Sequence, residues 1–152
     1  MDKNALFYKL VSFTSSVHRV TQELTKNAKS HSISQVQYNI LEYISVSQPV
    51  TPSEINDCQN MSMPNTSREL SKLSNKNLIE KINDTEDRRK QYIRLSNDGE
   101  AMMNEAFATI ESRFLKRIEN ASIEDLEDIE RALEILQAKL FYSSDKSAIV
   151  LR

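Results

Sequence analysis

Three consecutive cations, Arg88-Arg89-Lys90, stand in a charged segment, 84–90, between two strand-like runs, 78–83 and 91–96. Two such runs around a short polar segment predict a β-hairpin. Exposed cations at a hairpin tip bury no apolar surface, but they can neutralise phosphates or enter a minor groove. The hairpin therefore indicates contact with DNA, and the alternative is a solvated loop that keeps a sheet edge soluble.

A short helix with polar residues at its N-terminal end is predicted directly before the hairpin, over 63–76. Ser62 is a suitable N-cap, and Asn77 suits the left-handed position after a helix. A helix followed by a basic hairpin is the layout of a winged helix-turn-helix, whose second helix enters the major groove with its N-terminal residues. Thr66 lies one position off that face and is expected to pack inward. The residues expected to contact DNA are Ser62, Met63, Pro64, Asn65, Ser67 and Arg68, with Lys72 at a phosphate.

Several of these side chains have a definite chemistry towards DNA. Asn65 can pair bidentately with adenine, and Arg68 can pair with guanine or a phosphate. The alternative for Arg68 is an intramolecular salt bridge. At the hairpin, Arg88 and Arg89 suit insertion into the minor groove, and Lys90 suits a phosphate.

The distribution of charge supports this interpretation although the net charge is −2. Residues 62–94 hold eight Lys/Arg and five Asp/Glu, a local charge of +3. Residues 95–142 hold five Lys/Arg and eleven Asp/Glu, a local charge of −6. Because salt screens charges beyond about 10 Å, the local balance matters more than the total for contact with DNA.

Further helix signals flank the motif. Ser34 and Gln37 resemble a capping box, Thr51 and Pro52 open a third helix that ends near Gln59, and a long helix is expected over 98–119. The expected inward positions of these helices and of the helix predicted over 63–76 are Tyr38, Ile40, Leu41, Ile44, Leu70, Leu73, Met103, Phe107, Ile110, Phe114 and Ile118.

Two heptad-like apolar stripes stand at opposite ends of the chain, in helices expected over 5–28 and 122–142. A winged-helix core of about 65 residues has little surface on which to bury both stripes, so a second copy of the chain is the simplest partner. The alternative is that these helices pack only on their own core. The stripes are Leu6, Leu10, Phe13, Val17, Val20 and Leu24, and then Leu126, Ile129, Leu133, Leu136 and Leu140.

The predicted fold class is therefore mainly α with a small β-wing. A winged helix-turn-helix over 34–96 is flanked by N- and C-terminal dimerisation helices, 5–28, 98–119 and 122–142. All of these belong to one expected domain, 1–142, followed by a C-terminal tail, 143–152.

The composition argues against several other classes of protein. The chain has one glycine, which excludes glycine-rich nucleotide motifs and makes many-stranded folds improbable. It carries no Ser/His/Asp set or other catalytic constellation, so an enzyme is not expected. No apolar run approaches a membrane span, and the N-terminal residues MDKNALFYKL lack a signal peptide's apolar block. We therefore expect neither membrane insertion nor export from the cytoplasm. We expect a structural role for the single cysteine, Cys58, and neither a metal site at His18 and His31 nor any cofactor.

The chain resembles the MarR-type transcriptional regulators, the multiple-antibiotic-resistance class of winged-helix repressors. The wing carries the resemblance: Asp87-Arg88-Arg89, five residues, Leu95-Ser96 and then Asn97-Asp98-Gly99 are similar to the family's D-x-R, x₅, Leu-Thr, x-x-Gly signature. Three departures are Ser96 for threonine, Asn77 for glycine, and Pro64-Asn65 where small hydroxyl residues are common. The segments Thr51–Ile55, Ser67-Arg68 and Leu78-Ile79, together with Leu70 and Leu73, also fall where the family has like residues.

The resemblance implies a homodimeric, sequence-specific regulator of transcription, a repressor, that binds a palindromic double-stranded operator. It implies that Asp87 orients the nearby arginines. It also implies a small phenolic or lipophilic anionic effector in a crevice beside the dimerising helices. The candidate effector residues are Ser16, His18, Arg19 and Tyr38. Two alternatives stay open, a winged-helix module that binds another protein and an architectural regulator that needs no ligand.

Overall fold

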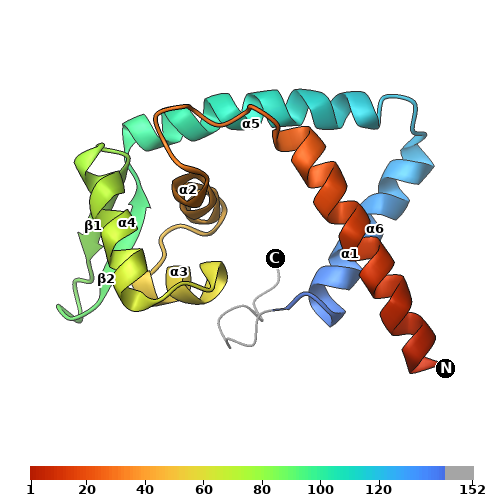
Figure 1. The fold of residues 1–152 in the computed structure, drawn as a ribbon, viewed down its shortest axis with the longest axis horizontal. Helices are drawn as coiled ribbons and strands as arrows, with labels where there is room; N and C mark the ends of the chain where they lie inside the picture. The colour runs from red at the N-terminus through yellow and green to blue at the C-terminus, as the bar shows by residue number, and fades with distance from the viewer. Residues whose placement is uncertain (143–152) are drawn as a thin grey trace. The chain divides into compact units, whose positions relative to one another are not determined.

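The computed structural model describes residues 1–142, and the expected tail, 143–152, lies outside the described residues. The described chain forms six helices and one two-stranded antiparallel sheet (Figure 1). The predicted fold class, mainly α with a small β-wing, is therefore confirmed. The elements are α1 (Lys3–Thr25), α2 (Gln35–Ser47), α3 (Pro52–Gln59), α4 (Met63–Asn75), β1 (Ile79–Asn83), β2 (Gln91–Leu95), α5 (Asn97–Arg117) and α6 (Ile123–Lys139).

The chain divides into two compact units, the first over Met1–Arg113 and the second beginning at Phe114. The first unit contains the winged helix-turn-helix, built from α2, α3, α4 and the two strands. The second unit contains the end of α5 and all of α6. That 1–142 behaves as one domain stays a prediction.

Side-chain caps determine where the helices of the first unit begin. Ser34 and Gln37 form a reciprocal capping box at α2, as predicted. Thr51 accepts from the Glu54 N–H at α3, with Pro52 at the first position, and Ser62 accepts from the Asn65 N–H at α4. Each cap satisfies a backbone N–H that has no partner inside its helix.

Asparagines in left-handed conformation redirect the chain after three helices. Asn27, Asn60 and Asn77 have φ of 57°, 51° and 59°, a conformation that asparagine tolerates better than most residues. Asn27 explains why α1 ends at Thr25 and not at the predicted residue 28. The Asp2 side chain, which accepts from the N–H groups of Asn4 and Ala5, explains why α1 begins two residues before the predicted start.

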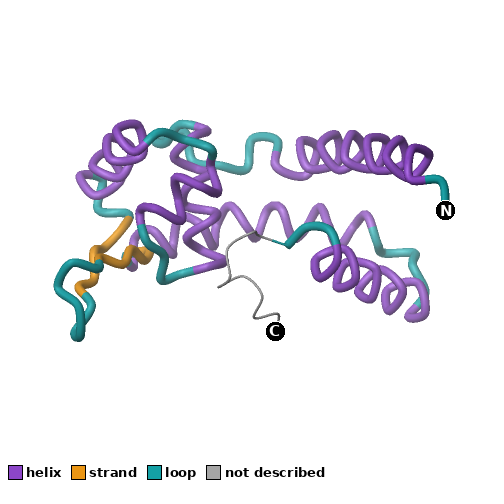
Figure 2. Tube along the Cα trace, turned by 90° about the horizontal axis from the view of Figure 1, so that it is seen from below, coloured by secondary structure: helices purple, strands orange, loops and turns teal. Residues whose placement is uncertain are grey.

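The wing is an antiparallel pair in which Ile79 faces Leu95 and Asn83 faces Gln91. Val50 adds a backbone bridge on the other side of β2, because its N–H and carbonyl both pair with Ile93, at 3.0 and 2.6 Å. The hairpin is therefore tied to the segment that connects α2 and α3. Figure 2 shows the loop between the strands extending beyond the helices of this unit.

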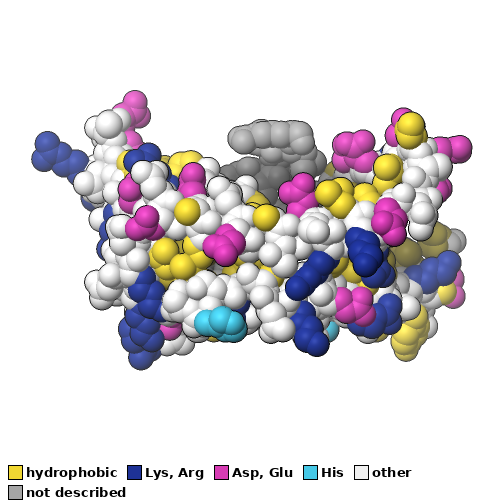
Figure 3. Space-filling model, turned by 90° about the horizontal axis from the view of Figure 1, so that it is seen from above, with side chains coloured by type: hydrophobic (Ala, Val, Ile, Leu, Met, Phe, Trp, Pro, Cys, Tyr) yellow, Lys and Arg dark blue, Asp and Glu magenta, His cyan; other side chains and the backbone are white. Residues whose placement is uncertain are grey.

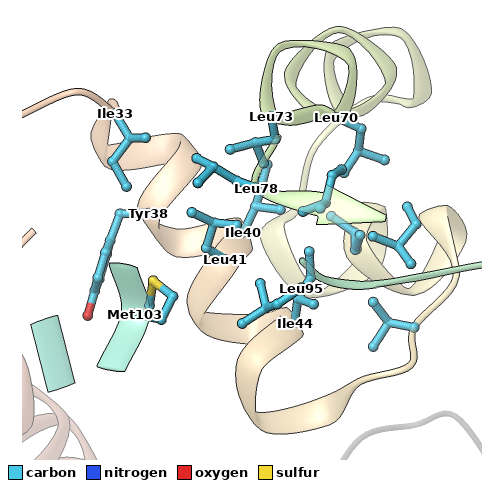
Figure 4. Close-up of a cluster of buried hydrophobic side chains, with 14 of the residues drawn as sticks. Ile33, Tyr38, Ile40, Leu41, Ile44, Leu70, Leu73, Leu78, Leu95 and Met103 are labelled. Carbon is cyan, nitrogen blue, oxygen red and sulfur yellow. The ribbon is translucent and has the colours of Figure 1, made fainter. Parts of the chain in front are cut away.

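The core of the first unit lies between α2, α4 and the sheet. Figure 4 shows Ile40 and Ile44 of α2 with Leu70 and Leu73 of α4 among the buried side chains, with Met103 of α5 at one edge. Phe107 and Ile110 are partly buried against this cluster. Phe114 is 43% exposed, contrary to the prediction, since it lies past the end of the first unit. The predicted core positions that are confirmed as buried are Tyr38, Ile40, Leu41, Ile44, Leu70, Leu73 and Met103.

The start of α5 packs against the chain that leads into β1. The Ser96 hydroxyl donates to the Asn77 carbonyl at 2.6 Å and accepts from the Gly99 N–H at 2.9 Å. The Ser96 N–H donates to the Leu78 carbonyl at 3.0 Å. A Cβ at Gly99 would lie 2.0 Å from that same Leu78 oxygen, so only glycine fits. This contact gives a physical reason for the Leu-Ser-x-x-Gly part of the wing signature.

The two apolar stripes remain largely uncovered within their own units. No residue of α1 or α6 is buried. Exposed members of the stripes include Leu6, Phe13 and Val17 in α1 and Leu126, Ile129, Leu133 and Leu140 in or next to α6. Among the described residues, the helices are too short or too polar to pass through a bilayer.

Candidate nucleic-acid interface

The helix α4 separates into a buried face and an exposed face. Thr66 is 1% exposed and lies inward with Leu70 and Leu73, as predicted. The side chains predicted to enter the groove all lie on the exposed part of the helix. They are Ser62, Met63, Pro64, Asn65, Ser67 and Arg68. The N-terminal half of α4 is therefore exposed on the face that carries these side chains.

Two of the exposed side chains contact each other. The Arg68 guanidinium donates through Nη2 to Oδ1 of Asn65, three residues earlier on the same helix. The alternative prediction for Arg68 was an intramolecular salt bridge, which requires a carboxylate. The partner in the structure is instead the side-chain amide of Asn65. Bidentate pairing with adenine uses both the carbonyl and the amino group of an asparagine. Because the Asn65 Oδ1 atom has two acceptor positions, Asn65 can hold Arg68 and still pair with adenine.

The flank of α4 next to α2 carries a polar cluster that includes one predicted residue, Lys72. Its Nζ lies 3.3 Å from Oε1 of Glu69, and the Lys72 side chain is 58% exposed. An exposed pair of this kind contributes little to stability, so Lys72 is able to exchange Glu69 for a phosphate. Sequence reasoning missed the partners of this cluster, Gln37 and Lys76. The capping box marked Gln37 as structured, but its contacts 32 and 39 residues away left no local signal.

The wing loop is closed by two aspartates. Asp84 accepts from the Glu86 N–H at 2.9 Å, and Asp87 accepts from the Arg89 N–H at 3.0 Å. Asp87 also lies 3.4 Å from Nε of Arg89, whose side chain is 93% exposed. Each bond spans two residues, so the aspartates order the turn itself.

The cations of the wing stand in solvent. Arg88, Arg89 and Lys90 are all exposed. Figure 3 shows Lys and Arg side chains projecting from the part of the first unit that carries α4 and the sheet. On the strands, Arg94 pairs with Glu80 at 2.9 Å. The cations at 88–90 are therefore accessible to a ligand.

A cavity of about 570 Å³ lies where α1 leads into α2. Of the four candidate effector residues, only Arg19 lines it. Ser16 is partly buried on α1, His18 is exposed, and Tyr38 is buried in the core. The full set of lining residues is Arg19, Gln22, Glu23, Thr25, Lys26, Asn27, Lys29, His31 and Gln35.

Tyr38 differs from the other effector candidates because its hydroxyl is buried without a hydrogen-bond partner in the structure. Burial raises the pKa of Tyr38 above its ordinary value, and the nearby Glu42 carboxylate raises it further. The hydroxyl is therefore neutral at any physiological pH, and the tyrosine acts as a core side chain.

Cys58 is exposed on α3, and its structural role stays a prediction. The buried residues of α3 are Ile55 and Asn56, so the outward face of the helix carries the cysteine. Local burial raises the pKa of the Cys58 thiol, while the Gln59 side chain opposes that rise.

Within residues 1–142, no three His, Cys, Asp or Glu side chains are grouped as metal ligands would be.

Comparison with known proteins adds an independent line of evidence. The model of the MarR family matches residues 31–90. The HTH-type transcriptional regulator TcaR of Staphylococcus aureus is 28% identical over 141 residues, which cover 90% of this chain and 93% of TcaR.

Solved structures with the same fold cover nearly the whole chain. The S. aureus MarR protein in complex with salicylate and kanamycin has a TM-score of 0.68 at 21% identity, covering 90% of this chain and 93% of its own. S. aureus MepR bound to ethidium bromide has a TM-score of 0.61 at 20% identity, covering 90% and 95%. The family match over residues 31–90, the relative that spans nearly the whole chain and the shared fold make this chain similar to the MarR-type winged helix-turn-helix regulators.

Proposed function

We propose that this regulator binds double-stranded DNA sequence-specifically, with α4 in the major groove and the wing loop in the adjacent minor groove. The observation that carries the proposal is the pairing of an exposed polar N-terminal half of α4 with an ordered, fully solvated cationic loop. Cations on an ordered loop lose less conformational freedom on binding than cations on a flexible tail. The wing therefore supplies affinity, and α4 supplies base readout.

The proposed binding form is a homodimer. Each unit presents apolar side chains that it does not bury itself, on α1 in the first unit and on α6 in the second. Contiguous exposed apolar surface of this kind is typical of an interaction site. A two-fold dimer presents two copies of α4, which predicts a palindromic operator with half-sites about one helical turn, about 10 bp, apart.

The proposed mode of control is repression relieved by a small anion. The cavity beside α1 is lined by Arg19, Lys26 and Lys29 against one carboxylate, Glu23. This excess of cations favours an anionic occupant. An anion that binds the DNA-free form more tightly than the DNA-bound form would shift the population away from the operator. We place the effector here and not at Tyr38, which the core encloses.

Selection of genomic fragments by the purified chain tests DNA binding and returns the operator in the same experiment. A DNA-binding regulator enriches a fragment containing an inverted repeat. No enrichment over bulk DNA at moderate salt would refute the proposal. An architectural regulator would instead retain DNA without a recurrent sequence, and a protein-binding module would retain none.

Substitution of the wing arginine then tests the docking. Arg89→Ala is expected to weaken operator binding and to lower the salt slope of the affinity by about one. Arg131→Ala in α6 is the matched control, since it removes the same charge far along the chain from the wing. Equal losses from the two variants would contradict a contact between the wing and DNA.

A further inference from the structure

Gln37 is a polar side chain in a buried position, 5% exposed, and every polar atom of its amide has a partner. Oε1 accepts from the Ser34 N–H at 3.1 Å and from Lys76 Nζ at 3.1 Å. Nε2 donates to Oε2 of Glu69 at 3.1 Å. A capping box needs only the first of these three bonds. The other two connect α2 to the reading helix and its C-cap.

Lys76 completes a polar bridge between the two segments. Its Nζ also donates to the Ser32 carbonyl at 2.6 Å. Glu69 lies on α4 one residue beyond Arg68 and holds Lys72 through its other oxygen, at 3.3 Å. We call Gln37, Glu69 and Lys76 the α2–α4 brace. The brace joins the entry of α2 to the flank of the helix that carries the predicted base-reading side chains.

The α2–α4 brace supplies directional hydrogen bonds, which the apolar contacts of α4 do not. Leu70 and Leu73 hold the buried face of α4 against the core, but apolar contact is not directional. It therefore restricts a small roll of the helix about its axis less sharply than a hydrogen bond does. Side chains on a helix are separated by 100° per residue, so a small roll would move Asn65 and Arg68 relative to a groove. A directional hydrogen bond from Gln37 to the flank opposes that roll.

We propose that Gln37 is a positioning residue for DNA reading, which sets the rotation of α4 through Glu69. The proposal rests on the DNA-binding function proposed above. It assigns to Gln37 no contact with DNA. It also differs from a purely structural role, because it concerns the orientation of α4 and not whether the chain folds.

A donor–acceptor swap tests the proposal without breaking the helix cap. In Gln37→Glu, the carboxylate still accepts from Ser34 and Lys76, but it repels Glu69 in place of donating to it. In Glu69→Gln, the new amide still accepts from Gln37. In the double variant, residue 69 donates to residue 37, so the bond is restored with reversed polarity and the net charge is unchanged.

We expect Gln37→Glu to lose preference for the operator over random DNA, and the double variant to regain it. Gln37→Glu should weaken binding to the selected operator about tenfold while changing binding to random DNA less than about threefold, as expected for one lost hydrogen bond to a charged group. Glu69→Gln should not weaken operator binding, and the double variant should return to within about threefold of the parent. Val36→Glu is the matched control, since it adds the same carboxylate at the adjacent exposed position.

A distance measurement reads the orientation of α4 without DNA. Spin labels at Val36→Cys and Ser71→Cys, in a Cys58→Ser background, report the separation of α2 and α4 by electron paramagnetic resonance. The distribution of distances between the two labels should broaden in Gln37→Glu and narrow again in the double variant, Gln37→Glu with Glu69→Gln.

Three results would overturn the positioning role. The first is a Gln37→Glu variant that binds the operator as tightly as Val36→Glu does. The second is a double variant whose operator affinity is no higher than that of Gln37→Glu. The third is a fall in the melting temperature of Gln37→Glu large enough to account for its loss of affinity. If the parent chain bound no DNA, the proposed function would fail, and the distance distributions alone would decide whether the brace orients α4.

Discussion

Replacing Gly99 with alanine tests the contact between the start of α5 and the chain entering β1. An alanine Cβ at this position would lie 2.0 Å from the Leu78 oxygen and 3.0 Å from the Leu78 carbonyl carbon. Both are backbone atoms, so no side chain can rotate to relieve the clash. One segment must move by about 1 Å to restore ordinary contact, and it would pull on the bonds from Ser96 to Leu78 and Asn77.

The size of the effect follows from three contributions. Alanine in place of glycine inside a helix would by itself stabilise by about 1 kcal/mol. Overpacking against an immobile neighbour costs about 1–3 kcal/mol, and weakening the two Ser96 bonds costs about 0.5–1.5 kcal/mol each. The net loss is about 1–5 kcal/mol. For a chain of this length, that loss lowers the melting temperature by about 2–20 °C.

Thermal unfolding followed by circular dichroism at one fixed protein concentration measures this loss, since the concentration affects the stability of a dimer. The control is Ala101→Gly, the reverse change at an exposed position of the same helix. That variant should lose only about 1 kcal/mol. A Gly99→Ala protein as stable as the parent would show that the close approach does not exist in solution.

Three further outcomes are expected. Asp87→Ala should weaken operator binding several-fold with no fall in melting temperature, because the lost bonds order only the exposed wing loop; an unchanged affinity in a gel-shift titration would argue against an ordered wing. Cys58 should react with iodoacetamide at pH 7 more slowly than a cysteine in a short peptide, because its raised pKa lowers the thiolate fraction, and the rate should climb as pH rises towards that pKa; a faster reaction would contradict the shift. Leu133→Glu should convert dimer to monomer in light scattering at micromolar concentration, since Leu133 is 61% exposed within its own unit; a dimer that persisted would place the interface elsewhere.

Local signals in the sequence predicted the elements of the winged helix-turn-helix well. Ser34, Thr51 and Ser62 cap helices as expected, and Asn77 adopts the left-handed conformation. Such signals are reliable because each cap bonds a backbone group only two or three residues away. The inward rotation of Thr66 was predictable for a related reason, since helical periodicity relates neighbouring residues of one helix.

Contacts between distant segments left no comparable trace in the sequence. The partners of Gln37 on α4 depend on how α2 and α4 cross, and the bridge from Val50 to Ile93 depends on where the chain before α3 passes the sheet. The exposure of Cys58 depends on which face of α3 meets the core. Periodicity fixes relations within an element, whereas crossing and rotation depend on the packing of all the elements together.

The candidate interface shows both kinds of information. The cationic wing tip at 88–90 and the polar start of α4 are each a run of consecutive residues, so their order along the chain alone predicted a hairpin beside a helix. Tertiary structure decided that Gln37 and Glu69 meet and that Gly99 lies against Leu78. The physical reason is one of range. Backbone capping and helical period act over a few residues, but a side chain's final partner is determined only when distant segments pack at one relative position.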